Sequence, residues 1–253
     1  MDAAAADHPR PDHSGADHSG ADPRPDHSRP AEGLPELPAP RRMPERYSVR
    51  DQVLAELRGA IAGGELRPGS VHSAPVLAAR YGVSATPVRE AMQLLAREGA
   101  VEVLPNRGFR IAERGPRDLA ELAELRALLE VPVLLRLART LPPGVWESLR
   151  PLAQATAGAA AMGDRAAYAE ADRAFHRALL EPAGNRQLVA FADDLQRRAQ
   201  WPPSAPQPHR YPRPAALLAD ATEHALLLDA LIAVDLPTVE ALARAHLSGS
   251  PWG

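Results

Sequence analysis

The sequence SATPVREA at residues 84–91 predicts the start of a helix. Ser84 or Thr86 can cap this helix, because a side-chain hydroxyl accepts a hydrogen bond from a free N–H of the first turn. Pro87 suits the first helical position, where its missing N–H would have had no partner. Gly82 separates this helix from a shorter one that precedes it. The pair is typical of a helix-turn-helix.

The segments on either side complete the arrangement. Before the pair, apolar residues line one face of a further helix, which Gly63 and Gly64 end: Val49, Val53, Leu54, Leu57 and Ile61. After the pair, apolar and polar residues alternate on both sides of a turn at residues 105–108, which predicts a β-hairpin: Val101, Val103, Phe109 and Ile111. Residues 45–114 are therefore predicted to form a winged helix-turn-helix domain.

The charge of this region indicates its partner. Residues 41–114 hold 12 arginines against 8 acidic residues, whereas the whole chain has a net charge of −3. In a winged helix, the second helix of the pair enters the major groove of DNA, where arginine can bind guanine edges, and an arginine at the hairpin tip can reach phosphates or the minor groove. Helix pairs broken by glycine are common, so the pattern alone leaves DNA binding and a plain helical scaffold equally open.

The remainder of the chain, residues 115–253, is predicted to form an all-α bundle of about six helices, so the fold class is mainly α. Pro132 is expected to kink the first helix, and the proline-rich residues 202–214 are expected to form a loop. Residues 1–44 repeat Asp-His-Ser and hold too few large apolar residues to offset the entropy of ordering, which predicts a disordered tail. The expected helical spans are 117–140, 144–161, 164–181, 186–200, 215–233 and 236–248.

The composition excludes several classes of protein. The chain has no cysteine, which excludes disulfides and thiolate metal sites. It has no apolar run of about 18 residues that could span a membrane, and its amino-terminal residues lack the apolar core of a signal peptide. We therefore expect a cytoplasmic, nucleoid-associated protein with no membrane partner.

Four side chains of the helical region can bind a divalent metal ion. Asp172 and His176 are four residues apart, so both project from one face of a helix, and His224 and His246 follow on two later helices. Imidazole and carboxylate ligands suit Zn²⁺, Ni²⁺, Mn²⁺ or Fe²⁺, and the sequence leaves the choice among these ions open. In the ordinary alternative, Asp172 pairs with a neighbouring arginine on the surface and His176 is a hydrogen-bonded core residue.

A series of short motifs runs from Val53 to Ile111: LRPG at 66–69, LA at 77–78, GVS at 82–84, TPVREA at 86–91, Leu95, EG at 98–99 and RG at 107–108. In this order the motifs resemble the DNA-binding domain of the GntR family of transcriptional regulators. The resemblance implies that Thr86 and Arg89, with Ser84 beside them, contact the operator, and that Arg107 and Gly108 do so at the wing tip. It also implies a homodimer that binds a palindromic site in double-stranded DNA.

The sequence departs from the GntR family at two places. Ala85 stands where the family usually has arginine, and SAPV at residues 73–76 replaces charged residues that include an arginine in contact with DNA. A base contact of this kind contributes about 1–3 kcal/mol of discrimination. The operator is therefore either different from the common sites of the family or bound more weakly, and our hypothesis is a different operator.

A second series of motifs covers the helical region: LR at 125–126, Glu130, Asp172, FH at 175–176, AGN at 183–185, EH at 223–224 and AHL at 245–247. These motifs resemble the FCD ligand-binding domain of the FadR subfamily of GntR regulators. The resemblance implies that Asp172, His176, His224 and His246 hold the ion, and that a small carboxylate-bearing metabolite occupies its open positions. It also implies that Arg126 approaches the effector carboxylate, although a salt bridge with Glu130 is an equally ordinary role.

Together these observations predict a metabolite-responsive transcriptional regulator, more commonly a repressor in such families. The alternative is a metal-dependent enzyme with an appended nucleic-acid-binding module. An enzyme needs a general acid or base beside the ion, and the nearby acids Glu170 and Glu223 are expected to point away from the ligands. In a third interpretation the ion is purely structural.

Overall fold

The computed structural model describes residues 48–202 and 214–248, all of which belong to one compact unit, residues 46–253. The tail predicted at residues 1–44 and nearly all of the loop predicted at residues 202–214 lie outside the described residues. Within the described ranges, no helix is long and apolar enough to cross a membrane.

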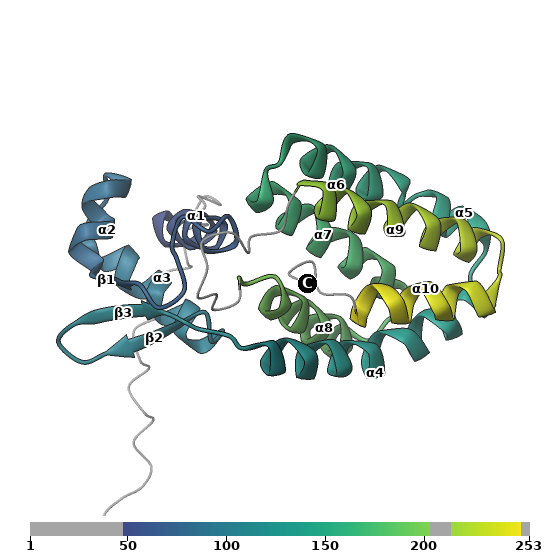
Figure 1. Cartoon of the computed structure of the whole chain (residues 1–253), viewed down its shortest axis with the longest axis horizontal. Helices are drawn as coiled ribbons and strands as arrows, with labels where there is room; N and C mark the ends of the chain where they lie inside the picture. The colour runs from purple at the N-terminus through teal and green to yellow at the C-terminus, as the bar shows by residue number, and fades with distance from the viewer. Residues whose placement is uncertain (1–47, 203–213, 249–253) are drawn as a thin grey trace, which may run out of the picture. The chain divides into compact units, whose positions relative to one another are not determined.

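The predicted winged helix-turn-helix is confirmed. Helices α1 (Val49–Ala62), α2 (Ala74–Tyr81) and α3 (Ala85–Arg97) are followed by the hairpin of β2 (Val101–Leu104) and β3 (Gly108–Ile111), as Figure 1 shows. The hairpin is antiparallel, and Val103 of β2 is paired with Phe109 of β3.

One strand of the domain was not predicted from the sequence. β1 (Val71–His72) pairs antiparallel with β3, so the sheet has the order β1-β3-β2. A strand of two residues is too short to show an alternating pattern, because periodicity needs several residues to be visible. β1 is a strand only because β3, a segment much later in the chain, lies beside it and pairs with it.

Helix α3 begins one residue before Thr86. Ser84 occupies the cap position in extended conformation, but its hydroxyl makes no capping hydrogen bond, and Pro87 is the third helical residue rather than the first. The helix buries one face, and burial of a side chain as large as Leu95 stabilises the fold by about 1.5–3 kcal/mol. The buried residues recur every three or four positions: Val88, Ala91, Met92 and Leu95.

The predicted all-α bundle is also confirmed. In Figure 1, α10 lies between α4 and α9, and α7 packs against α6 and α8. The bounds of these helices are as follows: α4 Pro116–Thr140, α6 Arg150–Met162, α7 Arg165–Leu180, α8 Arg186–Ala199, α9 Pro214–Ile232 and α10 Leu236–Ser248.

One helix prediction is wrong. The span expected at residues 144–161 is two helices, because α5 (Pro143–Glu147) ends before α6 begins at Arg150. Pro151 has no N–H to donate to the carbonyl oxygen of Glu147, so one continuous helix cannot pass through this point without losing a hydrogen bond. By contrast, α4 contains Pro132 and continues on both sides of it. The short 3₁₀ helix η1 (Glu181–Ala183) follows α7.

Candidate functional site

Eight polar side chains of the described bundle are buried, and they gather at its centre. An unpaired polar or charged group in such a place costs several kcal/mol, so each needs a partner or a bound ion. The eight come from α4, α6, α7, α8, α9 and α10: Arg126, Glu130, Thr156, Asp172, His176, Gln196, His224 and His246.

The four side chains predicted to bind a metal lie together. The Nε2 atom of His246 is 3.0 Å from Nε2 of His176 and 3.2 Å from Nε2 of His224. The Oδ1 atom of Asp172 is 3.2 Å from Nε2 of His224 and 3.5 Å from Nε2 of His176. Ligand atoms bound about 2.0–2.1 Å from one ion are roughly 3.0–3.4 Å from their neighbours. The four donor atoms are therefore spaced as ligands of a single divalent ion.

The hydrogen bonds of Thr156 orient His224. The Thr156 hydroxyl donates to the backbone oxygen of Ala153 at 2.7 Å, so its oxygen is left to accept from Nδ1 of His224 at 3.0 Å. A ring that carries its proton on Nδ1 presents a lone pair on Nε2. His224 thus directs an unprotonated nitrogen toward the other three donors.

The other two histidines also face acceptors on their outer side. Nδ1 of His246 is 2.8 Å from Oε2 of Glu223 and 3.3 Å from Oδ1 of Asp220. Nδ1 of His176 is 3.5 Å from Oε2 of Glu130. A histidine that binds a metal nearly always donates its other N–H to such a partner, which fixes the orientation of the ring. Each of the three rings thus has an acceptor near the nitrogen that faces away from the cluster, as a metal-binding imidazole would need.

The two carboxylate oxygens of Asp172 have different surroundings. Its Oδ2 atom accepts hydrogen bonds from the side-chain amides of Gln196 and of Gln200, the second at 2.6 Å. Its Oδ1 atom is buried and has no hydrogen-bond partner among the described residues. A buried carboxylate oxygen without a donor, surrounded by imidazole nitrogens, is a position that a cation would fill.

The electrostatics of the cluster favour positive charge at its centre. Burial lowers the pKa of the His176 imidazole, which keeps that ring neutral and able to bind an ion. Burial alone would raise the pKa of Asp172, but the nearby imidazoles of His176 and His224 hold it below its usual range. Burial would lower the pKa of His246, but the hydrogen bond with Glu223 and the charges of Asp220 and Asp172 together outweigh it, so the pKa is raised. The carboxylates therefore attract a cation, whether a proton or a metal ion.

Arg126 lies beside this cluster and forms the salt bridge that its spacing allows. Its Nε atom donates to Oε1 of Glu130 at 2.9 Å. Burial alone would raise the pKa of Glu130, but the charge of Arg126 and the hydrogen bond with His176 hold it below its usual value. The Nη2 atom of Arg126 is buried and lacks a hydrogen-bond partner among the described residues. One donor of the guanidinium thus remains for a ligand.

The structure corrects one expectation about acidic residues and contradicts one of the alternatives. Glu223 does not point away from the site, because the packing of α9 against α10 brings its carboxylate to His246. Asp172 is not a surface residue paired with an arginine, since it is buried and bonded to two glutamines. Glu170 does point away: its side chain is 69% exposed and pairs with Arg173.

Several residues of the site were not found from the sequence. Thr156, Gln196, Gln200 and Asp220 belong to no motif, and they reach the cluster only through contacts between helices. Their distances along the chain from the four ligands follow no helical repeat, so the sequence pattern could not identify them.

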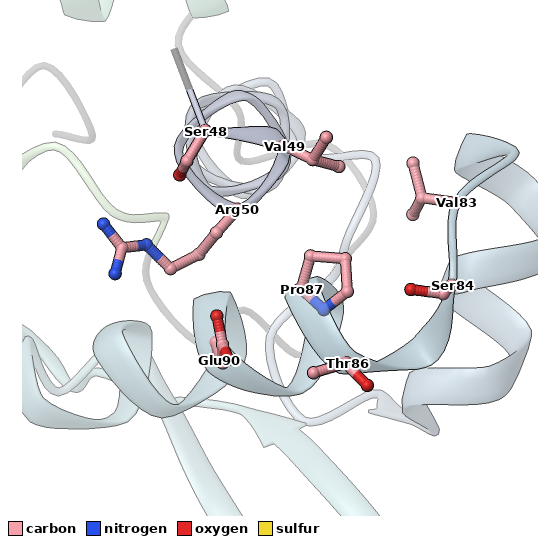
Figure 2. A pocket seen from close by; sticks show the side chains of 8 residues that line it. All are labelled: Ser48, Val49, Arg50, Val83, Ser84, Thr86, Pro87 and Glu90. Carbon is pink, nitrogen blue, oxygen red and sulfur yellow. The ribbon is translucent and has the colours of Figure 1, made fainter. Parts of the chain in front are cut away.

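The predicted DNA-binding residues lie on the surface of the winged helix. Ser84, Thr86 and Arg89 are exposed on the first turns of α3 and just before it. Within the described part of the chain, no acidic side chain pairs with Arg89. An open hollow of about 590 Å³ lies between the first turns of α1 and α3, and Thr86 and Pro87 are among the residues that line it. Figure 2 shows Pro87 turned toward Val49.

The wing tip is shaped by backbone conformation. Asn106 and Gly108 have φ angles of 58° and 106°, in the left-handed region that favours glycine. A Cβ atom at Gly108 would collide with the backbone oxygen of His72, so only glycine lets β1 approach β3 this closely. Arg107 is exposed between them, and no acidic side chain of the described residues pairs with it.

The two departures from the GntR pattern are also on this face. Ala85 is half-buried at the first position of α3, and Pro75 and Val76 are exposed on the first turn of α2. None of the three can donate a side-chain hydrogen bond to DNA. At these positions the surface therefore offers no cationic side chain to DNA.

Comparison with known proteins assigns both halves of the chain. The family model described as "Bacterial regulatory proteins, gntR family" matches residues 49–111, and the one described as "FCD domain" matches residues 121–249. The "Uncharacterized HTH-type transcriptional regulator in unstable DNA locus" of Streptomyces ambofaciens is 32% identical over 206 residues, which are 78% of this chain and 81% of that protein.

Two further proteins extend the comparison. The "Probable D-xylose utilization operon transcriptional repressor" of Paenarthrobacter nicotinovorans is 35% identical over 141 residues, which are 56% of this chain and 60% of that protein. The solved structure of McbR/YncC from Escherichia coli has a TM-score of 0.64 and 28% identity, and the match covers 79% of this chain and 93% of that one. These relatives are transcriptional regulators rather than enzymes, and their helix-turn-helix implies DNA binding. The chain described here belongs to the GntR family of bacterial transcriptional regulators and carries an FCD domain.

Proposed function

We propose that this regulator binds a divalent ion at Asp172, His176, His224 and His246, and that a small carboxylate metabolite bound beside the ion changes its affinity for DNA. The observation that carries the proposal is the Oδ1 atom of Asp172. It is buried, has no hydrogen-bond partner among the described residues and lies 3.2 Å from Nε2 of His224 and 3.5 Å from Nε2 of His176. The four ligands suit Zn²⁺, Ni²⁺, Mn²⁺ or Fe²⁺.

The effector class follows from the same geometry. A divalent ion supplies positive charge that attracts a carboxylate oxygen. Arg126 would hold the second carboxylate oxygen through its free Nη2 donor, while its Nε remains on Glu130. Arginine is suited to this role because its planar guanidinium presents several donors in fixed directions. A small organic acid satisfies both requirements.

On DNA, we propose that Ser84, Thr86 and Arg89 read the major groove, and that Arg107 and Gly108 place the wing against the backbone or the minor groove. A homodimer would bind a palindromic operator whose half-sites match the two-fold axis of the protein. The absence of a donor at Ala85 supports an operator different from the common sites of the family. Such a regulator acts on the chromosome, in the cytoplasm.

Repression is the sense of regulation that a relative supports. The Paenarthrobacter nicotinovorans protein is named a probable repressor of a D-xylose utilization operon. By extension, the metabolite would release this regulator from its operator. Release requires that the metabolite bind the free and the DNA-bound forms with different affinities.

A selection of bound DNA from random duplexes tests the proposal. The full chain is used with added ZnCl₂, with a chelator and with a panel of organic acids. We expect one palindromic sequence, whose recovery changes on chelation and falls with at least one acid. A melting temperature that drops on chelation but shifts with no acid would instead mean that the ion is purely structural.

Replacement of Glu223 by alanine should weaken ion binding about 10–100-fold, the usual effect of losing an outer hydrogen-bond partner of a metal ligand. Glu223 accepts from His246, and Asp220 is left to hold the ring. Isothermal titration of the full chain with ZnCl₂ measures the change. The matched control is Glu240→Ala, because Glu240 lies on α10 and pairs only with Arg244 among the described residues. Equal affinities of the two variants would contradict the assigned role of Glu223.

Replacement of Arg126 by lysine should leave ion binding intact and remove the response to acids. Lysine keeps the positive charge next to Glu130, but it lacks the second donor of the guanidinium fork. Thermal melts of the ion-loaded chain with a panel of mono- and dicarboxylic acids measure the response. Arg136→Lys, an exposed residue on the same helix, is the control. Retention of an acid-dependent shift in the Arg126→Lys variant would show that another group holds the carboxylate.

A further inference from the structure

Trp201 joins the end of α8 to the core of the winged helix. Its side chain is buried, with an exposed fraction of 4%, in the apolar cluster that contains Leu57, Leu95 and Val101. Within the described ranges, every other buried member of that cluster lies between Val53 and Ile111. One residue that follows a bundle helix thus forms part of the core of the DNA-binding domain.

The residue directly before Trp201 contacts the metal site. The side-chain amide of Gln200 donates to Oδ2 of Asp172 at 2.6 Å and to the backbone oxygen of Ala169 at 2.8 Å. Both acceptors are on α7, so these two bonds fix the end of α8 to the helix that carries two of the ligands. Consecutive residues therefore contact a metal ligand and the winged-helix core.

Trp201 also contacts the segment between β3 and α4. The guanidinium carbon of Arg114 is 4.8 Å from the centre of the Trp201 ring, a distance at which the cation is attracted to the ring face. The Nη2 atom of Arg114 donates to the backbone oxygen of Gly99 at 3.2 Å. A displacement of Trp201 would act on the connection between the two domains as well as on the core.

A second set of contacts runs parallel to this one. Arg197 of α8 pairs with Asp193 at 2.6 Å and with Glu98 at 3.8 Å, and Glu98 also pairs with Arg58 of α1. Arg165 at the start of α7 donates to the backbone oxygen of Gly63 at 2.6 and 3.1 Å. These polar contacts hold α1 against α7 and α8.

We propose that Gln200 and Trp201 transmit the state of the metal site to the winged helix. The inference rests on the proposed function, since it requires an ion at Asp172. When Oδ1 of Asp172 binds or releases the ion, the carboxylate changes orientation and Oδ2 moves. Gln200 follows its hydrogen bond, and the neighbouring Trp201 shifts against the core and against Arg114. The ion and the operator are then coupled, because each favours one position of Trp201.

Trp201 fluorescence provides the test. The parent is the full chain with Trp146→Phe and Trp252→Phe, so that Trp201 is its remaining tryptophan. ZnCl₂ is titrated into it while ion binding is followed by calorimetry, and affinity for the duplex recovered by selection is measured with ZnCl₂ and with chelator. We expect the emission to change and to saturate together with ion binding, and operator affinity to depend on the ion.

The decisive variant is Gln200→Met, which keeps the length of the side chain but has no donor for Asp172. It is expected to bind Zn²⁺ at most about 10–100-fold more weakly. At saturating ion, its emission should not change and its operator affinity should no longer depend on the ion. Gln187→Met, at an exposed position of the same helix, should behave as the parent. A second variant, Trp201→Leu, should bind the ion as the parent does and lose the ion-dependent change in operator affinity.

The outcomes separate this inference from the proposed function. A parent that binds no ion in calorimetry overturns the proposed function and this inference with it. A parent that binds the ion with no change in emission or operator affinity overturns the inference alone. So does a Gln200→Met variant that retains the full ion-dependent change.

Discussion

Replacement of His224 by alanine is expected to abolish tight binding of a divalent ion. The side chain is fully buried, and its Nε2 atom is 3.2 Å from Oδ1 of Asp172 and 3.2 Å from Nε2 of His246. Loss of a ligand should weaken binding by more than the roughly 10–100-fold that accompanies loss of an outer hydrogen bond. Isothermal titration of the full chain with ZnCl₂ measures the affinity and the stoichiometry.

The control for this prediction is His72→Ala. His72 is outside the cluster and bonds with the Ser70 hydroxyl, so its loss should leave the stoichiometry unchanged. Circular dichroism establishes that the His224→Ala variant is folded under the conditions of the titration. Undiminished affinity in a folded His224→Ala chain would mean that the ion is bound elsewhere.

Replacement of Arg89 by alanine should weaken binding to the selected operator about 5–150-fold, which corresponds to about 1–3 kcal/mol for a base contact. Arg89 is exposed on the second turn of α3, and within the described residues no acidic side chain neutralises it. The variant should also lose its preference at one base pair of each half-site. Fluorescence anisotropy with the operator and with single-base variants of it measures both effects.

Two other arginines distinguish base reading from phosphate binding. Arg97 is exposed at the opposite end of α3, and Arg97→Ala should bind the operator as the unmodified chain does. Arg107→Ala at the wing should weaken binding to all duplexes alike and reduce the dependence on salt, as expected for a phosphate contact. A loss of affinity in Arg89→Ala that is the same for every sequence would contradict base reading by Arg89.

The winged helix could be predicted because its local patterns and its packing agree. The apolar residues of α3 recur at helical spacing, and the same residues are buried, including Met92 and Leu95. Two features could not be predicted. β1 is defined by its pairing with β3, a segment distant in sequence. The first residue of α3 depends on the geometry of the preceding turn, which the order of Ser84, Thr86 and Pro87 does not determine.

The candidate site divides in the same way. Asp172 and His176 are found from their spacing on one helix, and His224 and His246 stand out because histidine is rare in the helical region. The surrounding hydrogen bonds could not be predicted, because they join helices far apart in sequence. Thr156 and His224 are 68 residues apart, and Gln200 and Asp172 are 28 apart. Threonine and glutamine are also common on helix surfaces, so their type indicates nothing by itself.

The position of Trp201 also bears on how such regulators could exchange parts during evolution. The GntR match ends at residue 111 and the FCD match begins at residue 121, so by sequence the two domains could be recombined between these residues. The packing crosses this boundary. Trp201 lies within the segment that matches the FCD domain, but its side chain is buried in the core of the winged helix. If this winged helix were joined to an FCD domain without a tryptophan at the equivalent position, its core would contain a cavity in place of the indole. Recombination at residues 112–120 would therefore keep this core filled only where the incoming FCD domain also supplies a large apolar side chain at the position of Trp201.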